Sequence, residues 1–62
     1  MRSIKQVLME RDGLTKDEAH NLINDARQDF HDRLANGESY IELEDICNEW
    51  FGLEPDYIDE LM

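Results

Sequence analysis

The apolar residues of this chain recur at steps of three and four residues within separate segments. Because 3.6 residues complete one turn of an α-helix, this spacing places each set on one face of a helix. The pattern predicts helices over residues 4–12, 16–36 and 40–51. The three apolar sets are Ile4, Val7 and Leu8; Ala19, Leu22, Ile23, Ala26, Phe30 and Leu34; and Tyr40, Leu43, Ile46, Cys47, Trp50 and Phe51.

A short fourth helix is predicted over residues 55–61. Pro55 suits the first helical position, because its φ is already fixed and it has no amide hydrogen to leave without an acceptor. The inward-facing residues of this helix are Tyr57, Ile58 and Leu61.

Polar residues and glycines mark where these helices begin and end. A Ser or Thr followed three residues later by Glu or Gln is a capping box, in which each side chain accepts a hydrogen bond from a backbone amide of the other residue. Glycine is favoured directly after a helix, where a left-handed backbone is needed. The capping boxes are Ser3 with Gln6, Thr15 with Glu18 and Ser39 with Glu42, and the glycines are Gly13, Gly37 and Gly52.

These signals predict an all-α fold: a compact three-helix bundle with a short fourth C-terminal helix, forming a single domain over residues 1–62. The connections are too short for anything except neighbouring helices. We expect Trp50 in the core, since the chain has few large side chains with which to build one. Ile41 lies outside the apolar arc of its helix, where it can cover the second helix or mark a self-association patch.

The composition is strongly acidic, with six Lys and Arg against sixteen Asp and Glu and a net charge of −10. Such a charge repels phosphate backbones and argues against direct nucleic-acid binding. The single cysteine, Cys47, allows no disulfide within the chain, which favours a reducing cytoplasm. Charged residues interrupt every apolar stretch, so we expect no signal peptide and no membrane span.

The acidity is concentrated at the end of the chain. Residues 1–14 sum to +1, residues 15–36 to −2 and residues 37–62 to −9, and residues 37–62 contain no Lys or Arg. A soluble surface is one explanation of this charge. A surface that binds a basic protein is the other, and its candidate residues are Glu42, Glu44, Asp45, Glu49, Glu54, Asp56, Asp59 and Glu60.

Candidate catalytic and metal-binding residues are few. His20 and His31 lie on one predicted helix about 16 Å apart, too far to share a metal ion. Cys47 lies on a predicted buried face with acidic neighbours, which makes it a packing residue and not a nucleophile. Asp25, Asp29 and Asp32 are expected on a solvated helix face, with Asp29 paired to Arg33 four residues on. We therefore expect no enzymatic activity, no metal and no cofactor.

Both ends of the chain resemble short acidic helical proteins of unknown function encoded by bacteriophages and prophages. The matching segments are IKQVLMERDGLTKDEA at residues 4–19 and WFGLEPDYIDELM at residues 50–62. The resemblance implies a phage-related protein of the bacterial cytoplasm, with no activity to assign to any residue. Small acidic phage proteins often occupy host enzymes, including nucleic-acid-handling and CRISPR complexes.

The favoured function is a non-enzymatic protein-binding module whose acidic C-terminal helices contact a basic surface of a host or phage protein, as an inhibitor of that protein. The alternative is a self-associating structural or assembly accessory without an inhibitory role. In that case exposed aromatic residues and Ile41 would join the copies, and the charge would only keep them soluble.

Overall fold

The computed structural model describes residues 2–62, apart from the side chain of Tyr40. Its elements in chain order are α1 (Ile4–Arg11), α2 (Lys16–Ala35), α3 (Tyr40–Leu43), α4 (Asp45–Phe51) and a 3₁₀-helix, η1 (Pro55–Glu60). No strand is present among the described residues. The prediction of an all-α chain is confirmed.

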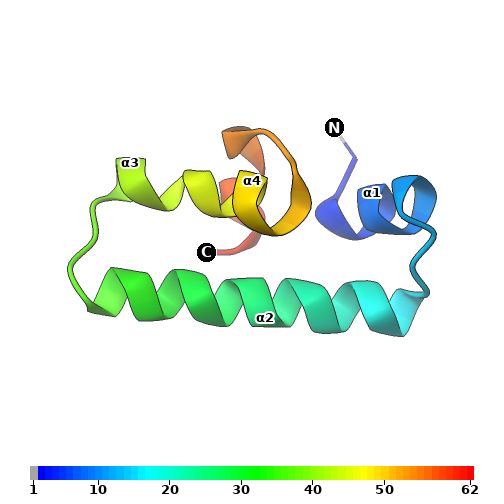
Figure 1. Cartoon of the computed structure of the whole chain (residues 1–62), viewed down its shortest axis with the longest axis horizontal. Coiled ribbons are helices and arrows are strands. Elements are labelled where there is room, and N and C mark those ends of the chain that lie inside the picture. The colour runs from blue at the N-terminus through cyan, green and yellow to red at the C-terminus, as the bar shows by residue number, and fades with distance from the viewer. Residues whose placement is uncertain (1) are drawn as a thin grey trace.

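The long helix α2 supports the rest of the molecule (Figure 1). Helix α1 lies over the N-terminal end of α2, and α3 and α4 lie over its C-terminal half. The 3₁₀-helix packs against α4. The molecule measures 34 × 20 × 15 Å along its principal axes, so its length is close to the ~30 Å of a 20-residue helix.

The predicted capping boxes are confirmed. In α1 and α2 the hydroxyls of Ser3 and Thr15 accept from the N3 amides, and the N3 side chains accept from the cap amides. Before α3, Ser39 and Glu42 make the same pair of hydrogen bonds, at 3.3 and 3.4 Å. Local sequence thus fixes three of the helix starts.

The end of α4 shows why glycine is needed there. Gly52 has a φ of 66°, in the left-handed region that residues with a Cβ rarely adopt. This turn directs the amides of Gly52 and Leu53 back to the carbonyls of Asn48 and Cys47, at 3.0 and 3.1 Å. The bond from the Gly52 amide to the carbonyl four residues earlier is that of the αL motif, which satisfies a carbonyl that a helix end otherwise leaves without a donor.

One continuous helix over residues 40–51 was expected, and the structure corrects this to two helices that meet at Glu44. Glu44 has φ −60° and ψ −26°, values of a tightened 3₁₀ turn that stays in the right-handed region. Carboxylates at Glu42, Asp45 and Glu49 follow one another at steps of three and four residues, and this like-charge spacing destabilises a continuous helix.

The predicted last helix is also corrected, because η1 is a 3₁₀-helix. The amides of Tyr57 and Leu61 bond to the carbonyls three residues earlier, at 3.2 and 2.9 Å. A period of three places Ile58 and Leu61 on one face, and both are buried. Burial of this apolar face against other elements therefore stabilises η1.

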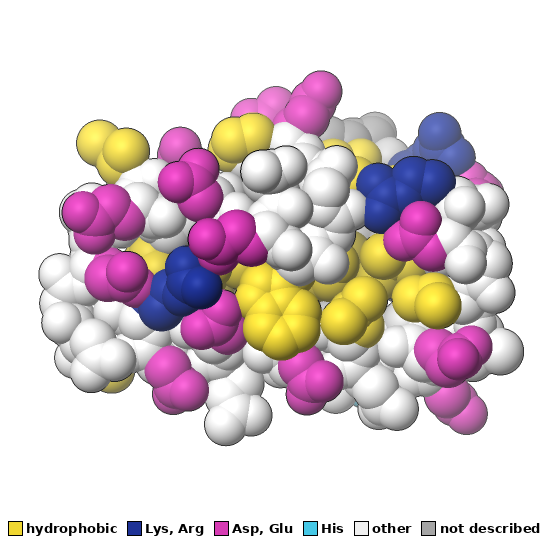
Figure 2. Space-filling view, in the orientation of Figure 1, with side chains coloured by type: hydrophobic (Ala, Val, Ile, Leu, Met, Phe, Trp, Pro, Cys, Tyr) yellow, Lys and Arg dark blue, Asp and Glu magenta, His cyan; other side chains and the backbone are white. Residues whose placement is uncertain are grey.

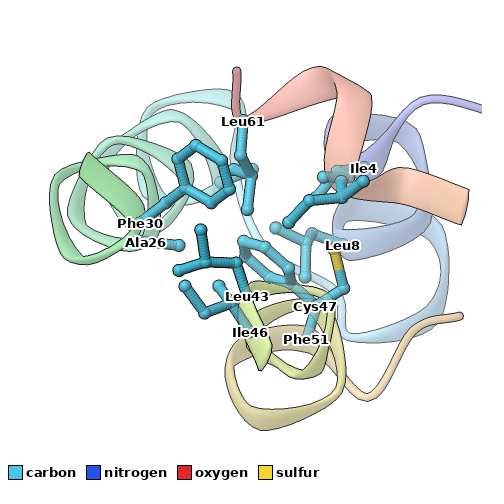
Figure 3. Packing of buried hydrophobic residues seen from close by; sticks show 11 residues of the cluster. Ile4, Leu8, Ala26, Phe30, Leu43, Ile46, Cys47, Phe51 and Leu61 are labelled. Atoms are coloured by element: carbon cyan, nitrogen blue, oxygen red, sulfur yellow. The ribbon is translucent and has the colours of Figure 1, made fainter. Parts of the chain in front are cut away.

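All elements contribute to one apolar cluster (Figure 3). Leu34, expected on the apolar face of α2, is 48% exposed. Four other residues expected on inward faces are only partly buried at the edge of the cluster: Leu22, Ile23, Trp50 and Tyr57. Ile41 is 78% exposed, so of its two expected places it does not take the one that covers the second helix. The buried members of the cluster are Ile4, Leu8, Ala19, Ala26, Phe30, Leu43, Ile46, Cys47, Phe51, Ile58 and Leu61.

Candidate functional site

Three of the candidate carboxylates form a row along α3 and α4. Glu42, Asp45 and Glu49 are separated by three and four residues, so they share one side of these helices, and all three are exposed. Among the described residues, Glu42 and Asp45 make no ion pair, whereas Glu49 pairs with Arg33 at 3.0 Å. We call Glu42, Asp45 and Glu49 the acidic row.

Glu44 lies apart from the acidic row. It lies at the junction of α3 and α4 and is partly buried, whereas the three residues of the acidic row are exposed. Its side chain makes no capping hydrogen bond at the start of α4. The structure therefore does not bring this candidate together with the row.

A second group of candidates lies at η1. Glu54, Asp56 and Asp59 are exposed. Residues three apart are eclipsed in a 3₁₀-helix, so Asp56 and Asp59 project from the same side. Figure 2 shows Asp and Glu side chains spread over the upper edge of the molecule, with few Lys or Arg among them.

Glu60 has a role inside the fold. Its Oε1 accepts a hydrogen bond of 3.0 Å from the amide of Ile4, one of the amides that the first turn of α1 leaves without a carbonyl. The backbone carbonyl of Glu60 accepts from Arg27 Nη2 at 3.1 Å. This candidate is partly buried and joins the two ends of the described chain.

A network that the sequence only partly predicted joins α2 to α4. The predicted pair of Asp29 and Arg33 is present, with Arg33 Nη2 3.1 Å from Asp29 Oδ2. The indole nitrogen of Trp50 also donates to Asp29 Oδ2, at 2.9 Å. Asp29 is thus partly buried and bonded to two side chains, Arg33 and Trp50, which corrects its expected place on a solvated face.

No signal in the sequence predicted the contact of Trp50 with Asp29, because these residues are 21 positions apart. The same holds for Arg33 and Glu49, which are on different helices. Only the i, i+4 spacing of Asp29 and Arg33 could be recognised from the sequence. The sequence therefore predicted the local ion pair but not the contacts that Trp50 and Glu49 make with it.

Cys47 is a residue of α4 and is fully buried in the core. Burial, together with the negative charge of Glu60, raises the pKa of its thiol to about 11. The thiol is therefore protonated at neutral pH and is a poor nucleophile. This confirms its role as a packing residue.

His20 and His31 are both exposed on α2. Within residues 2–62, as far as the structure describes them, no group of three or more His, Cys, Asp or Glu is arranged to hold a metal ion. None of the described helices is both long and apolar enough to cross a membrane.

Comparison with known proteins gives no relative. No protein-family model, no curated protein and no solved structure matches the chain. The surface geometry described above is therefore the basis for a functional proposal.

Proposed function

We propose that this chain is a non-enzymatic protein-binding module that presents the acidic row, with Glu54, Asp56 and Asp59, to a basic surface of a partner protein. The observation that carries the proposal is the exposure of carboxylates in a segment that has no Lys or Arg of its own. Opposite charges accelerate association and exclude wrong partners.

The proposal includes the nature of the partner and the setting. The partner is a host or phage protein, such as a nucleic-acid-handling or CRISPR complex that this chain inhibits in the bacterial cytoplasm. In this proposal α1, α2 and the unit of α3 and α4 act as a compact three-helix bundle that holds the acidic row in place. Glu44 and Glu60 add to the negative charge of this surface but do not contact the partner directly.

The test compares two variants with equal net charge, using a short polylysine peptide as the basic probe. One variant is Glu42→Gln with Asp45→Asn, in which glutamine keeps the capping box with Ser39. The control is Asp17→Asn with Asp32→Asn, which removes two exposed charges from α2. We expect the first variant to bind the probe more weakly than the control.

Salt gives a second readout of the same proposal. Binding should disappear near 1 M salt, where the screening length falls to about 3 Å. Equal weakening by both variants would show that only total charge matters. Salt-independent binding would contradict the proposal directly.

Self-association is the second candidate, and the exposure of Ile41 favours it. This side chain is 78% exposed at the outer surface of α3. Measurement of the mass in solution separates the two candidates. A monomer at all salt concentrations counts against self-association, and an oligomer that persists in high salt and is lost on Ile41→Ser supports it.

A further inference from the structure

An apolar strip lies on the face of the molecule shown in Figure 2. Hydrophobic side chains follow the seam between α2 and the elements packed on it. Trp50 lies at this seam, because its indole nitrogen donates to Asp29 of α2. Leu22 precedes Asp29 by seven residues, two helical turns, and so lies on the same flank of α2. Both Trp50 and Leu22 are partly buried at the edge of the core.

Carboxylates border this strip on both sides. On α2, Glu18 and Asp25 stand four residues before and three residues after Leu22, which makes them its neighbours on the helix surface, and both are exposed. On α4, Glu49 is adjacent to Trp50. Figure 2 shows Asp and Glu side chains above and below the line of hydrophobic side chains.

Arg33, the cation near the Trp50 end of the strip, is neutralised by its neighbours. Arg33 lies 3.1 Å from Asp29 and 3.0 Å from Glu49, with Glu38 at 4.0 Å. Its charge is therefore balanced by more than one carboxylate. Beside Arg33 the border of the strip keeps a negative field, whereas Figure 2 shows Lys or Arg above the other end of the strip.

We infer that the apolar strip binds a basic amphipathic helix of a partner protein, an inference that rests on the proposed function and specifies its partner. The apolar side of such a helix would cover Trp50 and Leu22. Its Lys and Arg would lie over the carboxylates on either side. A helix of about 18 residues spans ~27 Å, which fits along the 34 Å molecule.

The experiment uses Trp50 as the reporter, because it is the only tryptophan of the chain. The probe is an 18-residue peptide of Leu and Lys with apolar residues at helical spacing, which makes it about 27 Å long. A scrambled peptide of identical composition is the control. The amphipathic peptide should shift the Trp50 emission to shorter wavelength and bind at least about tenfold more tightly than the scrambled one, a factor worth ~1.4 kcal/mol.

Two matched variants locate the binding site. Leu22→Gln should weaken binding of the amphipathic peptide about tenfold, since it removes part of the apolar surface that the peptide covers. Leu34→Gln makes the same chemical change on the same helix, but at a position turned about 120° from Leu22 at 100° per residue. That variant should bind like the wild type. Circular dichroism of both variants confirms that the helices are intact.

The outcomes separate this inference from the proposed function. Equal, salt-sensitive binding of the two peptides would overturn the inference and leave the acidic-surface proposal standing. If Leu22→Gln and Leu34→Gln weaken peptide binding equally, the apolar strip is not the binding site. A shift of Trp50 emission by phosphatidylglycerol vesicles without peptide would assign the strip to a membrane and overturn a protein partner. If neither peptide binds the wild type, the inference is wrong whatever the variants do.

Discussion

The first and second halves of this chain reach the same helical state by different means. Residues 2–36 form two helices that begin with complete capping boxes and carry all of the Lys and Arg. Residues 37–62 form three elements of four, seven and six residues, too short to be stable alone in water. The second half also holds nine carboxylates and no cation, so it depends on the first half for its order.

Three arginines of the first half supply much of that support. Arg11 donates to the carbonyl of Phe51 at the end of α4, and Arg27 donates to the carbonyl of Glu60 at the end of η1. Arg33 pairs with Glu49. Each arginine lies near the C-terminal end of one of these elements, where a positive charge is favourable. The acidic segment is therefore stabilised from outside itself.

The largest expected effect on stability comes from a side chain of the first half that packs against residues of the second half. Phe30 of α2 is buried beside Leu43 of α3 and Leu61 (Figure 3). Phe30→Ala should lower the free energy of unfolding by about 3–5 kcal/mol, a large part of what so small a chain has. Urea unfolding followed by circular dichroism measures this. Leu34→Ala is the control and should cost far less, since Leu34 is 48% exposed. A larger loss of stability in Leu34→Ala than in Phe30→Ala would show that Phe30 is not the core residue that joins the two halves.

A smaller effect is expected from Arg33→Gln, which removes the cation between α2 and α4. We expect a loss of about 1 kcal/mol, because the ion pairs of Arg33 are partly exposed. Hydrogen exchange should increase in α4 more than in α1. Arg2→Gln, whose pair with Glu10 is more exposed, is the control and should change little. Uniform exchange changes along the chain would contradict the dependence of the second half on this arginine.

The smallest effect concerns pH, and its sign differs between the halves. Hydrogen bonds from Thr15 lower the pKa of Glu18, and Arg11 lowers the pKa of Asp12. A carboxylate with a lowered folded-state pKa stabilises the fold above its unfolded-state pKa, and this contribution is lost as the pH falls through the folded-state value. Protonation in residues 37–62 instead relieves repulsion between carboxylates.

Residue-resolved hydrogen exchange between neutral pH and about pH 3 tests this difference. The start of α2 should lose protection in acid before α4 does. Glu18→Gln keeps the capping box but does not titrate, so it should flatten the acid response of α2. An acid response that is unchanged in Glu18→Gln would show that this cap does not couple to pH.

The sequence predicted the first half more accurately than the second for a physical reason. Capping boxes and glycines act over a few residues, and they gave both α1 and α2 to within one residue. The break at Glu44 and the 3₁₀ form of η1 reflect repulsion and packing against distant elements. Carboxylates at helical spacing are visible in the sequence but do not show where a helix will break, and packing against distant elements leaves no local pattern.

At the candidate surface, too, the sequence predicted local features but not long-range contacts. The exposure of Glu42, Asp45 and Glu49 follows from their spacing alone. The hydrogen bond of Trp50 to Asp29 and that of Glu60 to the amide of Ile4 connect residues 21 and 56 positions apart. Such partners are set by the tertiary fold, so a sequence shows that these groups exist but not what they contact.

The bond between Glu60 and Ile4 also bears on how the chain folds during synthesis. The first turn of α1 leaves the ribosome well before its acceptor, Glu60, which follows Ile4 by 56 residues. Domains usually begin to fold as they emerge, and contacts between distant residues slow that process. Here the nascent chain can form α2 early, while closure of the fold has to wait until residue 60 has left the ribosome.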